Sequence, residues 1–122
     1  MKKMTEKQRE RLEAASCIGK EVRFKEKGGT NRNKMGVVLD EVYIIVSDYK
    51  HLIQQIKPET PYWDGSRLGY RTCYYTFDAN RKNIKFGQYT QFLTEKEYRV
   101  LLSKARAKGW PIFKPSKPAT QN

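Results

Sequence analysis

The chain has 122 residues, of which 38% are hydrophobic and 31% charged, and its mean hydropathy is −0.85. This length suits one ordinary domain and excludes a two-domain enzyme, while an aromatic content of 12% excludes a disordered tail protein, which has few large side chains to bury. Lysine and arginine number 25 against 13 aspartate and glutamate residues, so the net charge of +12 predicts a polyanionic partner.

The two cysteines indicate a reducing environment. Cys17 and Cys73 stand far apart and lack CxxC spacing, so the sequence predicts neither a zinc site nor a disulfide framework. Residues 1–6 carry charge but no apolar segment, and no run reaches the roughly 18 apolar residues of a membrane span. We therefore expect a cytoplasmic protein with reduced thiols, no export signal and no membrane contact.

The first predicted element is a short helix from about Glu6 to Ser16. Thr5 and Gln8 have the spacing of a capping box, in which each side chain accepts a hydrogen bond from the backbone N–H of the other residue. Few residues of this helix are apolar, so it either docks along a narrow stripe or forms an arm that orders on binding. We treat residues 1–18 as an N-terminal helical arm that ends at Gly19.

The next segments have strand-forming sequences. Glu21–Lys25 alternates polar and apolar residues, which predicts a strand with one apolar face. Lys27–Lys34 suits a hairpin loop, because its glycines and asparagines tolerate positive φ. Residues 36–39 and 42–46 are rich in β-branched and aromatic side chains, and they predict two strands or one strand bent at Asp40–Glu41.

Residues 47–66 carry conflicting signals. Leu52, Ile53 and Ile56 have helical spacing, and Pro58 would stop such a helix early. We expect one turn of helix followed by an irregular loop.

The clearest hairpin lies in the second half of the chain. Tyr70–Phe77 predicts a strand, Asp78–Asn83 its turn and Ile84–Gly87 the returning strand. Turn-forming residues between two runs of strand-forming residues support this prediction.

A second helix is predicted from 94 to 108. Thr94 and Glu97 form another capping box, and apolar residues follow at helical spacing. The helix is expected to dock through Tyr98, Leu101 and Leu102. Residues 114–122 are predicted to form a flexible basic tail, because they contain prolines and lysines with nothing to bury.

Together these elements predict an α+β fold. A small, highly curved antiparallel sheet or barrel spans about residues 20–90, and it carries the N-terminal helix and a C-terminal helix that covers its open side. Residues 19–113 form a single globular domain.

The opening hairpin has a recognisable pattern. Gly19-Lys20-Glu21-Val22-Arg23-Phe24, then a loop, then Met35-Gly36-Val37-Val38-Leu39-Asp40-Glu41-Val42, resembles the first hairpin of small KOW and Tudor-like β-barrels. In those barrels a G-x-x-V-x-F strand precedes a loop and a G-V-V strand. Over residues 19–46 the resemblance implies a bent barrel whose loops bind RNA, DNA or a peptide, and it implies no catalytic residue.

The charge is segregated along the chain. Residues 1–34 hold 11 basic and 5 acidic groups, residues 35–66 hold 2 and 5, and residues 67–122 hold 12 and 3. The corresponding net charges are +6, −3 and +9. If the two basic flanks fold onto one side, the protein gains the polarised field that favours phosphate binding.

Two basic segments are the candidate contact surfaces. The predicted loop at residues 28–34 contributes exposed amides and cations. The 67–86 segment interleaves cations with aromatic rings that can stack on bases. We expect a non-enzymatic nucleic-acid-binding module or accessory protein for DNA or RNA, with no cofactor and no metal. Its candidate binding residues are Lys27, Arg32, Lys34, Arg67, Arg71, Tyr75, Arg81, Lys82 and Lys85.

A protein partner is the alternative. An aromatic pocket for a peptide or cationic group would form if Asp48 and Asp64 lay beside Tyr49, Tyr62 and Trp63. A small phage or mobile-element inhibitor of a nucleic-acid enzyme would have the same composition.

Catalysis is not expected, because the chain has one histidine, His51, and no convergent titratable groups. Tyr74-Tyr75 and, after a hairpin-sized gap, residues 85–90 resemble the paired tripeptides of GIY-YIG endonucleases, with Arg99 on a following helix. The first tripeptide lacks Gly-Ile, and no acidic residue follows Glu97 to hold the metal of such enzymes. A nuclease is the enzymatic alternative.

Overall fold

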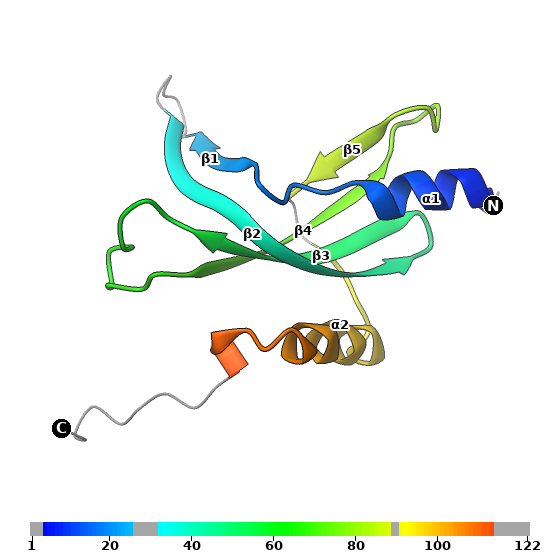
Figure 1. The fold of residues 1–122 in the computed structure, drawn as a ribbon. Coiled ribbons are helices and arrows are strands. Elements are labelled where there is room, and N and C mark those ends of the chain that lie inside the picture. Colours follow the sequence, from blue (N-terminus) through cyan, green and yellow to red (C-terminus); the bar gives the residue numbers. More distant parts are fainter. Residues whose placement is uncertain (1–3, 26–31, 89–90, 114–122) are drawn as a thin grey trace.

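The computed structural model describes residues 4–25, 32–88 and 91–113. Within these residues the chain forms two α-helices, one five-stranded sheet and a short 3-10 helix (Figure 1). In chain order they are α1 (Glu6–Ala14), β1 (Glu21–Lys25), β2 (Arg32–Val46), β3 (Tyr49–Lys57), β4 (Gly69–Phe77), β5 (Ile84–Gly87), α2 (Glu95–Ala107) and η1 (Pro111–Phe113). Both capping boxes form, at Thr5 and at Thr94, so the predicted helix starts are confirmed.

The sheet follows chain order. Its strands are arranged β1-β2-β3-β4-β5, each antiparallel to its neighbours, and they curl into a half-barrel (Figure 1). The predicted α+β class with a small curved antiparallel sheet is confirmed.

Strand β2 is one bent strand. Val38 pairs with Ile56 and Asp40 with Gln55, so Leu39 is an extra residue in a β-bulge, which bends the strand. Gly36 lies at a second irregularity, with φ of +139°, where a Cβ would lie 2.5 Å from the carbonyl oxygen of Lys57. The bent-strand alternative for residues 36–46 is therefore confirmed.

The predicted helical turn at Leu52–Ile56 is wrong, because these residues lie inside β3. Strand β3 pairs with β2 on one side and β4 on the other, so its backbone groups are satisfied by both neighbours. Its side chains are buried on both faces, so the sequence lacks the alternation of apolar and polar residues that marks a half-exposed strand. Four of the buried residues are polar, namely Lys50, His51, Gln54 and Gln55.

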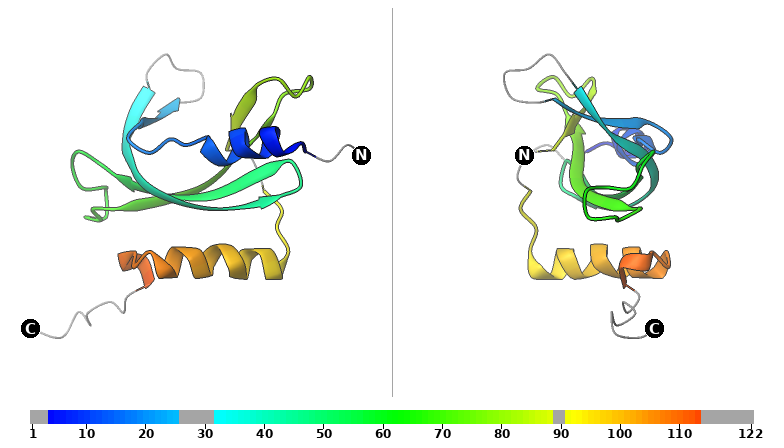
Figure 2. Two further views of the ribbon diagram at one scale, coloured as in Figure 1. Left: turned by 45° about the vertical axis from the view of Figure 1, so that its right-hand side comes forward. Right: turned by 90° about the vertical axis from the view of Figure 1, so that its left-hand side faces the viewer.

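Helix α2 covers the convex face of the sheet (Figure 2). Its buried residues Leu101 and Ala105 join Leu93 and Trp110 over Val42 and Ile44 of β2. The expected placement over the open side is therefore not observed, because β2 presents its apolar residues outward. None of the helices in the described segments is long and apolar enough to cross a membrane.

Helix α1 lies on the concave face instead (Figure 2). Leu12 is its one buried residue, and it is fully enclosed by Leu52, Cys73, Tyr75 and Phe77. The sequence left open whether this helix docks along a narrow stripe or forms an arm that orders on binding. The structure shows the docked helix. Helix α1 ends at Ala14, two residues before the predicted end.

Of the three predicted docking residues of α2, only Leu101 is buried, and Ala105 is the other buried residue of the helix. Leu101 is 1% exposed, whereas Leu102 is 44% and Tyr98 38% exposed. We expect Leu101→Ala to lower the free energy of unfolding by about 2–5 kcal/mol, because it opens a cavity in a closed core. Leu102→Ala is the matched control, with a loss below about 1 kcal/mol. Urea unfolding of both variants checks this, and equal losses would contradict the assignment.

Candidate binding site at the half-barrel mouth

Lys50 anchors α1 at one end of the concave face. Its side chain is 2% exposed, and Nζ donates to the backbone oxygens of Glu13, at 2.6 Å, and Ala15, at 2.5 Å. The ammonium also lies 4.2 Å from the ring centroid of Tyr43. Burial lowers the pKa of Lys50. The lysine thus satisfies carbonyls that the end of the helix leaves unpaired.

Glu41 anchors the segment that follows α1. Its carboxylate, 8% exposed, accepts hydrogen bonds from Oγ of Ser16 at 2.6 Å and from the backbone N–H of Cys17 at 3.2 Å. The third donor is Nε2 of Gln54, at 2.6 Å. These contacts hold the chain against the sheet immediately after the helix.

A chain of hydrogen bonds continues from Gln54 to the other end of the concave face. Oε1 of Gln54 accepts from Nε of Arg71 at 2.6 Å, and Nη1 of Arg71 donates to Oε1 of Gln88 at 3.0 Å. The guanidinium also lies 5.0 Å from the ring centroid of Phe86. Arg71 is therefore fixed by an amide on each side and a ring.

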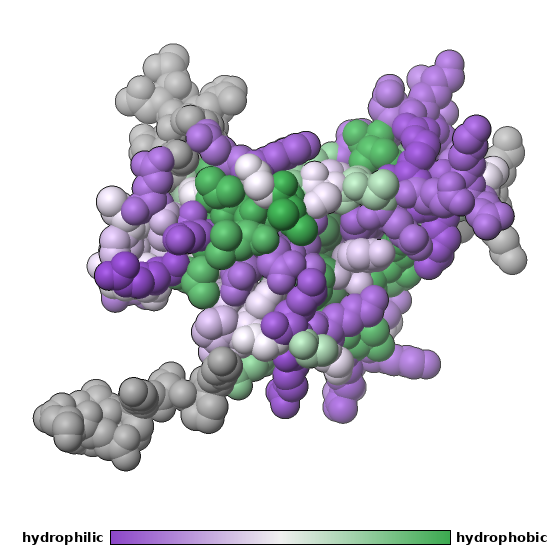
Figure 3. Space-filling view, in the orientation of Figure 1, coloured by the Kyte–Doolittle hydropathy of each residue, from purple (hydrophilic) through white to green (hydrophobic). Residues whose placement is uncertain are grey.

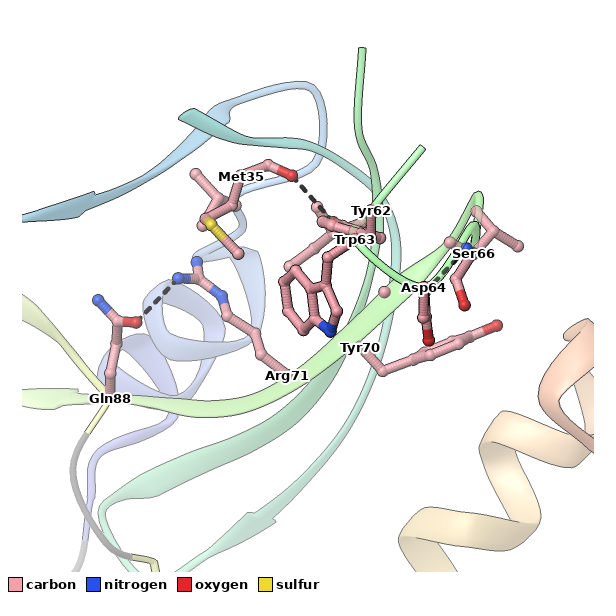
Figure 4. Close-up of a pocket in the computed structure, with 12 residues that line it drawn as sticks. Met35, Tyr62, Trp63, Asp64, Ser66, Tyr70, Arg71 and Gln88 are labelled. Atoms are coloured by element: carbon pink, nitrogen blue, oxygen red, sulfur yellow. Dashed lines mark hydrogen bonds between the residues drawn. The ribbon is translucent and has the colours of Figure 1, made fainter. Parts of the chain in front are cut away.

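Beside Arg71 lies a cavity of about 390 Å³ that is lined in part by the loop between β3 and β4. This loop lies at the end of the half-barrel away from α1 (Figure 1). We call it the mouth pocket. Figure 4 shows Arg71, Gln88 and Trp63 around this hollow, with Met35 beside them. The walls are mostly apolar or aromatic, and the lining residues are Val22, Met35, Ile56, Tyr62, Trp63, Asp64, Ser66, Leu68, Gly69, Tyr70, Arg71 and Gln88.

The outer wall of the mouth pocket is the loop between β3 and β4. The hydroxyl of Tyr62 donates to the backbone oxygen of Met35 at 2.9 Å, and burial raises the pKa of Tyr62. Oδ1 of Asp64 accepts from the Ser66 N–H at 2.9 Å, and this bond lowers the pKa of Asp64. Trp63 stands between these anchored residues and is 89% exposed. The loop therefore presents a bare indole from a fixed backbone.

Four of the predicted binding residues belong to this end of the molecule. Arg71 lines the mouth pocket, and Arg67 is exposed on the adjoining loop. Arg32 and Lys34 lie on β2 just before Met35, where their backbones pair with Lys25 and Arg23. Their predicted place in a loop is wrong, because β2 begins at Arg32. Lys27 lies outside the described residues.

Three other predicted residues lie at the opposite end, on the β4–β5 hairpin (Figure 1). Arg81, with φ of +57°, forms an ion pair with Asp48 of the β2–β3 turn. The backbone oxygen of Lys82 accepts from Nη2 of Arg11 at 2.6 Å, and Lys85 is exposed. Figure 3 shows this end covered mainly by hydrophilic residues. The predicted cations therefore divide into two separate groups.

Tyr75 cannot stack on a base, so its predicted role is wrong. The residue is 7% exposed in the core under α1, and its hydroxyl forms a 2.6 Å hydrogen bond with Sγ of Cys17. Burial, with this bond, raises the pKa of Tyr75. Alternation along β4 puts every second ring on the concave face, and α1 covers this one.

The acidic and aromatic residues of the alternative cation pocket do not meet. Asp48 lies in the β2–β3 turn and Tyr49 begins β3, whereas Tyr62, Trp63 and Asp64 follow the other end of that strand. The side chain of Asp48 is also engaged by Arg81. Aromatic side chains do line the mouth pocket, but Asp48 and Tyr49 are not among its lining residues.

His51 is a core residue on the α2 side. It is 6% exposed, its Nδ1 lies 2.7 Å from Oε1 of Gln91, and its ring stacks on Tyr49. Within the described segments no group of three histidine, cysteine, aspartate or glutamate residues is placed to hold a metal. The thiols of Cys17 and Cys73 form no disulfide, and burial raises the pKa of Cys73 to about 12.

Sequence reasoning missed Gln54, Gln88 and Met35 as parts of the site. Each is an ordinary residue in its local sequence, and its role depends on strands that lie far from it along the chain. Comparisons with protein-family models, curated proteins and solved structures find no match to this chain.

The buried amide of Gln54 gives a direct test of the hydrogen-bonded chain. Gln54→Leu removes a fully buried link and leaves Glu41 and Arg71 each short of a partner, so we expect a loss of about 1–3 kcal/mol in unfolding free energy. Gln88→Leu is the matched control, because Gln88 is exposed, and its loss should stay below about 1 kcal/mol. Urea denaturation measures both, and a neutral Gln54→Leu would contradict the role given to this link.

Proposed function

We propose that this protein is a non-enzymatic nucleic-acid-binding module that holds a single-stranded segment at the mouth pocket. The observation that carries the proposal is the pairing of an exposed indole, Trp63, with the fixed guanidinium of Arg71 at one cavity. Rings of this kind stack on bases without regard to sequence, while nearby cations follow the phosphates.

The distribution of acidic residues supports the proposal. In the acidic middle of the chain, Glu41 is buried, Asp48 pairs with Arg81, and Asp40 accepts from Nζ of Lys108 and Nε1 of Trp110. These carboxylates are used inside the protein or against its own donors. The excess of cations is therefore left for the surface, where phosphates can reach it.

The shape of the site favours single strands over duplex. A duplex presents its base faces only to neighbouring bases, so an exposed indole gains little from it, whereas an unpaired base can lie against the ring. The mouth pocket is a compact hollow and not a groove that would fit a double helix.

Basic residues near the mouth pocket also favour this end of the molecule as the binding surface. Arg32, Lys34 and Arg67 belong to segments that adjoin the mouth pocket, through Met35 on one side and Leu68 on the other. The resemblance of residues 19–46 to the first hairpin of KOW and Tudor-like barrels agrees with a binding module. A cytoplasmic setting with reduced thiols is part of the proposal.

Trp63 tests the stacking contact. We expect Trp63→Ala to weaken binding of a labelled oligo(dT) at low salt by about 1–3 kcal/mol, the usual worth of one base stacked on a ring. Phe92→Ala is the matched control, because Phe92 is another aromatic side chain, 88% exposed, that lies outside the mouth pocket. Fluorescence anisotropy measures both affinities. Equal effects of the two variants would reject the mouth as the binding site.

Salt dependence tests which cations meet phosphates. On single strands each neutralised phosphate adds about −0.7 to the slope of log affinity against log salt. The triple variant Lys27→Ser, Arg32→Ser, Lys34→Ser should make this slope shallower by about one such increment for each phosphate that is no longer neutralised. The double variant Lys82→Ser, Lys85→Ser, at the far end, should leave it unchanged. A slope that responds only to the double variant would move the interface to the β4–β5 hairpin.

A further inference from the structure

We infer that the mouth pocket selects guanine from a bound single strand, an inference that rests on the proposed function. Three features of the inner wall lead to it. The polar groups that remain free there are hydrogen-bond donors. The guanidinium of Arg71, which carries most of these donors, is held in place, and the cavity has room for one base.

The direction of each amide on the inner wall follows from its partners. Gln54 lies between a carboxylate, which only accepts, and an arginine, which only donates, so its Nε2 must face Glu41 and its Oε1 must face Arg71. Gln88 likewise turns its oxygen toward Arg71. Its Nε2 donors then remain for a ligand.

Arg71 adds further donors beside those of Gln88. Nε and one N–H of Nη1 each donate within the protein, which leaves the second N–H of Nη1 and both of Nη2 without a partner among the described residues. The hydroxyls nearby are already engaged, since Tyr62 donates to Met35 and Tyr70 accepts from Gln55. Asp64 belongs to the outer loop, where it bonds Ser66 (Figure 4). The inner wall therefore suits a ligand that carries acceptors.

Guanine fits these donors best among the four bases. Its N7 and O6 are adjacent acceptors on one edge, the arrangement that an arginine meets with two parallel hydrogen bonds. Adenine places an amino donor next to N7, so it would set a donor against Arg71. Unpaired cytosine does carry two adjacent acceptors, N3 and O2, but its single ring gives the indole less area to stack on than the double ring of guanine. Thymine has a single O4 acceptor beside a methyl group.

The surroundings of Arg71 favour this use. The guanidinium is already ordered by Gln54, Gln88 and Phe86, so it loses little freedom when a base binds. The cavity of about 390 Å³ lies at the small end of ligand sites, which run from about 300 to 1,000 Å³. It suits one base inserted beneath Trp63, with its neighbours outside.

The experiment compares oligo(dT) strands that differ in one central base. With the unaltered protein, a strand carrying guanine should bind roughly 5- to 150-fold tighter than one carrying adenine, the usual range for one arginine–guanine pair. Hypoxanthine keeps N7 and O6 and should preserve the advantage. Replacing guanine by 7-deazaguanine deletes the N7 acceptor and should remove most of it.

Arg71→Lys keeps the charge but loses the planar pair of donors. We expect it to abolish the preference for guanine over adenine while plain oligo(dT) still binds. Arg99→Lys, on α2, is the matched control and should keep the full preference, because Arg99 pairs with Glu95 on the surface of that helix. If Arg71→Lys fails to fold, the 7-deazaguanine comparison on the unaltered protein still decides.

The outcomes separate the inference from the proposed function. Equal binding of all four central bases, with Trp63→Ala still weakening it, would overturn guanine selection and leave single-strand binding in place. Failure of every strand to bind would overturn both. Binding of an apolar peptide with a free carboxylate instead, with a response from Trp63, would assign the donors of Arg71 and Gln88 to a protein partner and likewise overturn the inference.

Discussion

The carboxylate of Glu41 is the contact on which the rest of this structure depends. A buried carboxylate must be matched by donors, and here Ser16 and Cys17 supply two while Gln54 supplies the third. The first two bind the chain just after α1 to the sheet. The third sets the direction of Gln54, and through it the position of Arg71. One buried charge thus connects the docking of the N-terminal helix to the geometry of the mouth pocket.

Helix α1 needs these polar contacts because its apolar contact is small. Leu12 is its single buried residue, and burying one leucine contributes only about 1.5–3 kcal/mol. Lys50 adds two hydrogen bonds to the end of the helix. Because α1 ends at Ala14, it fills one end of the concave face and leaves the other as a cavity. The length of the helix therefore determines that the half-barrel has a pocket.

Local signals in the sequence predicted most elements, whereas tertiary contacts decided the rest. Capping boxes at Thr5 and Thr94 and the hairpin around Asp78–Asn83 were readable because their chemistry lies within a few residues. Strand β3 was misread because burial on both faces hides strand alternation. Tyr75 was misassigned because only α1, distant in sequence, covers its ring. For the same reason the site was half visible: Arg71 was recognised, but the glutamines that hold it were not.

The bend in β2 explains why the pocket stays open. The bulge at Leu39 and the tight passage at Gly36 turn the strand sharply, which carries β1 over the sheet without bringing it to β5. Among the described residues each of these edge strands pairs on one side only. Both are short, and the sequence places Lys25 and Lys85 on them, which discourages pairing with another chain. The gap between β1 and β5 adjoins the mouth pocket, because Val22 of β1 and Gln88, which follows β5, both line it.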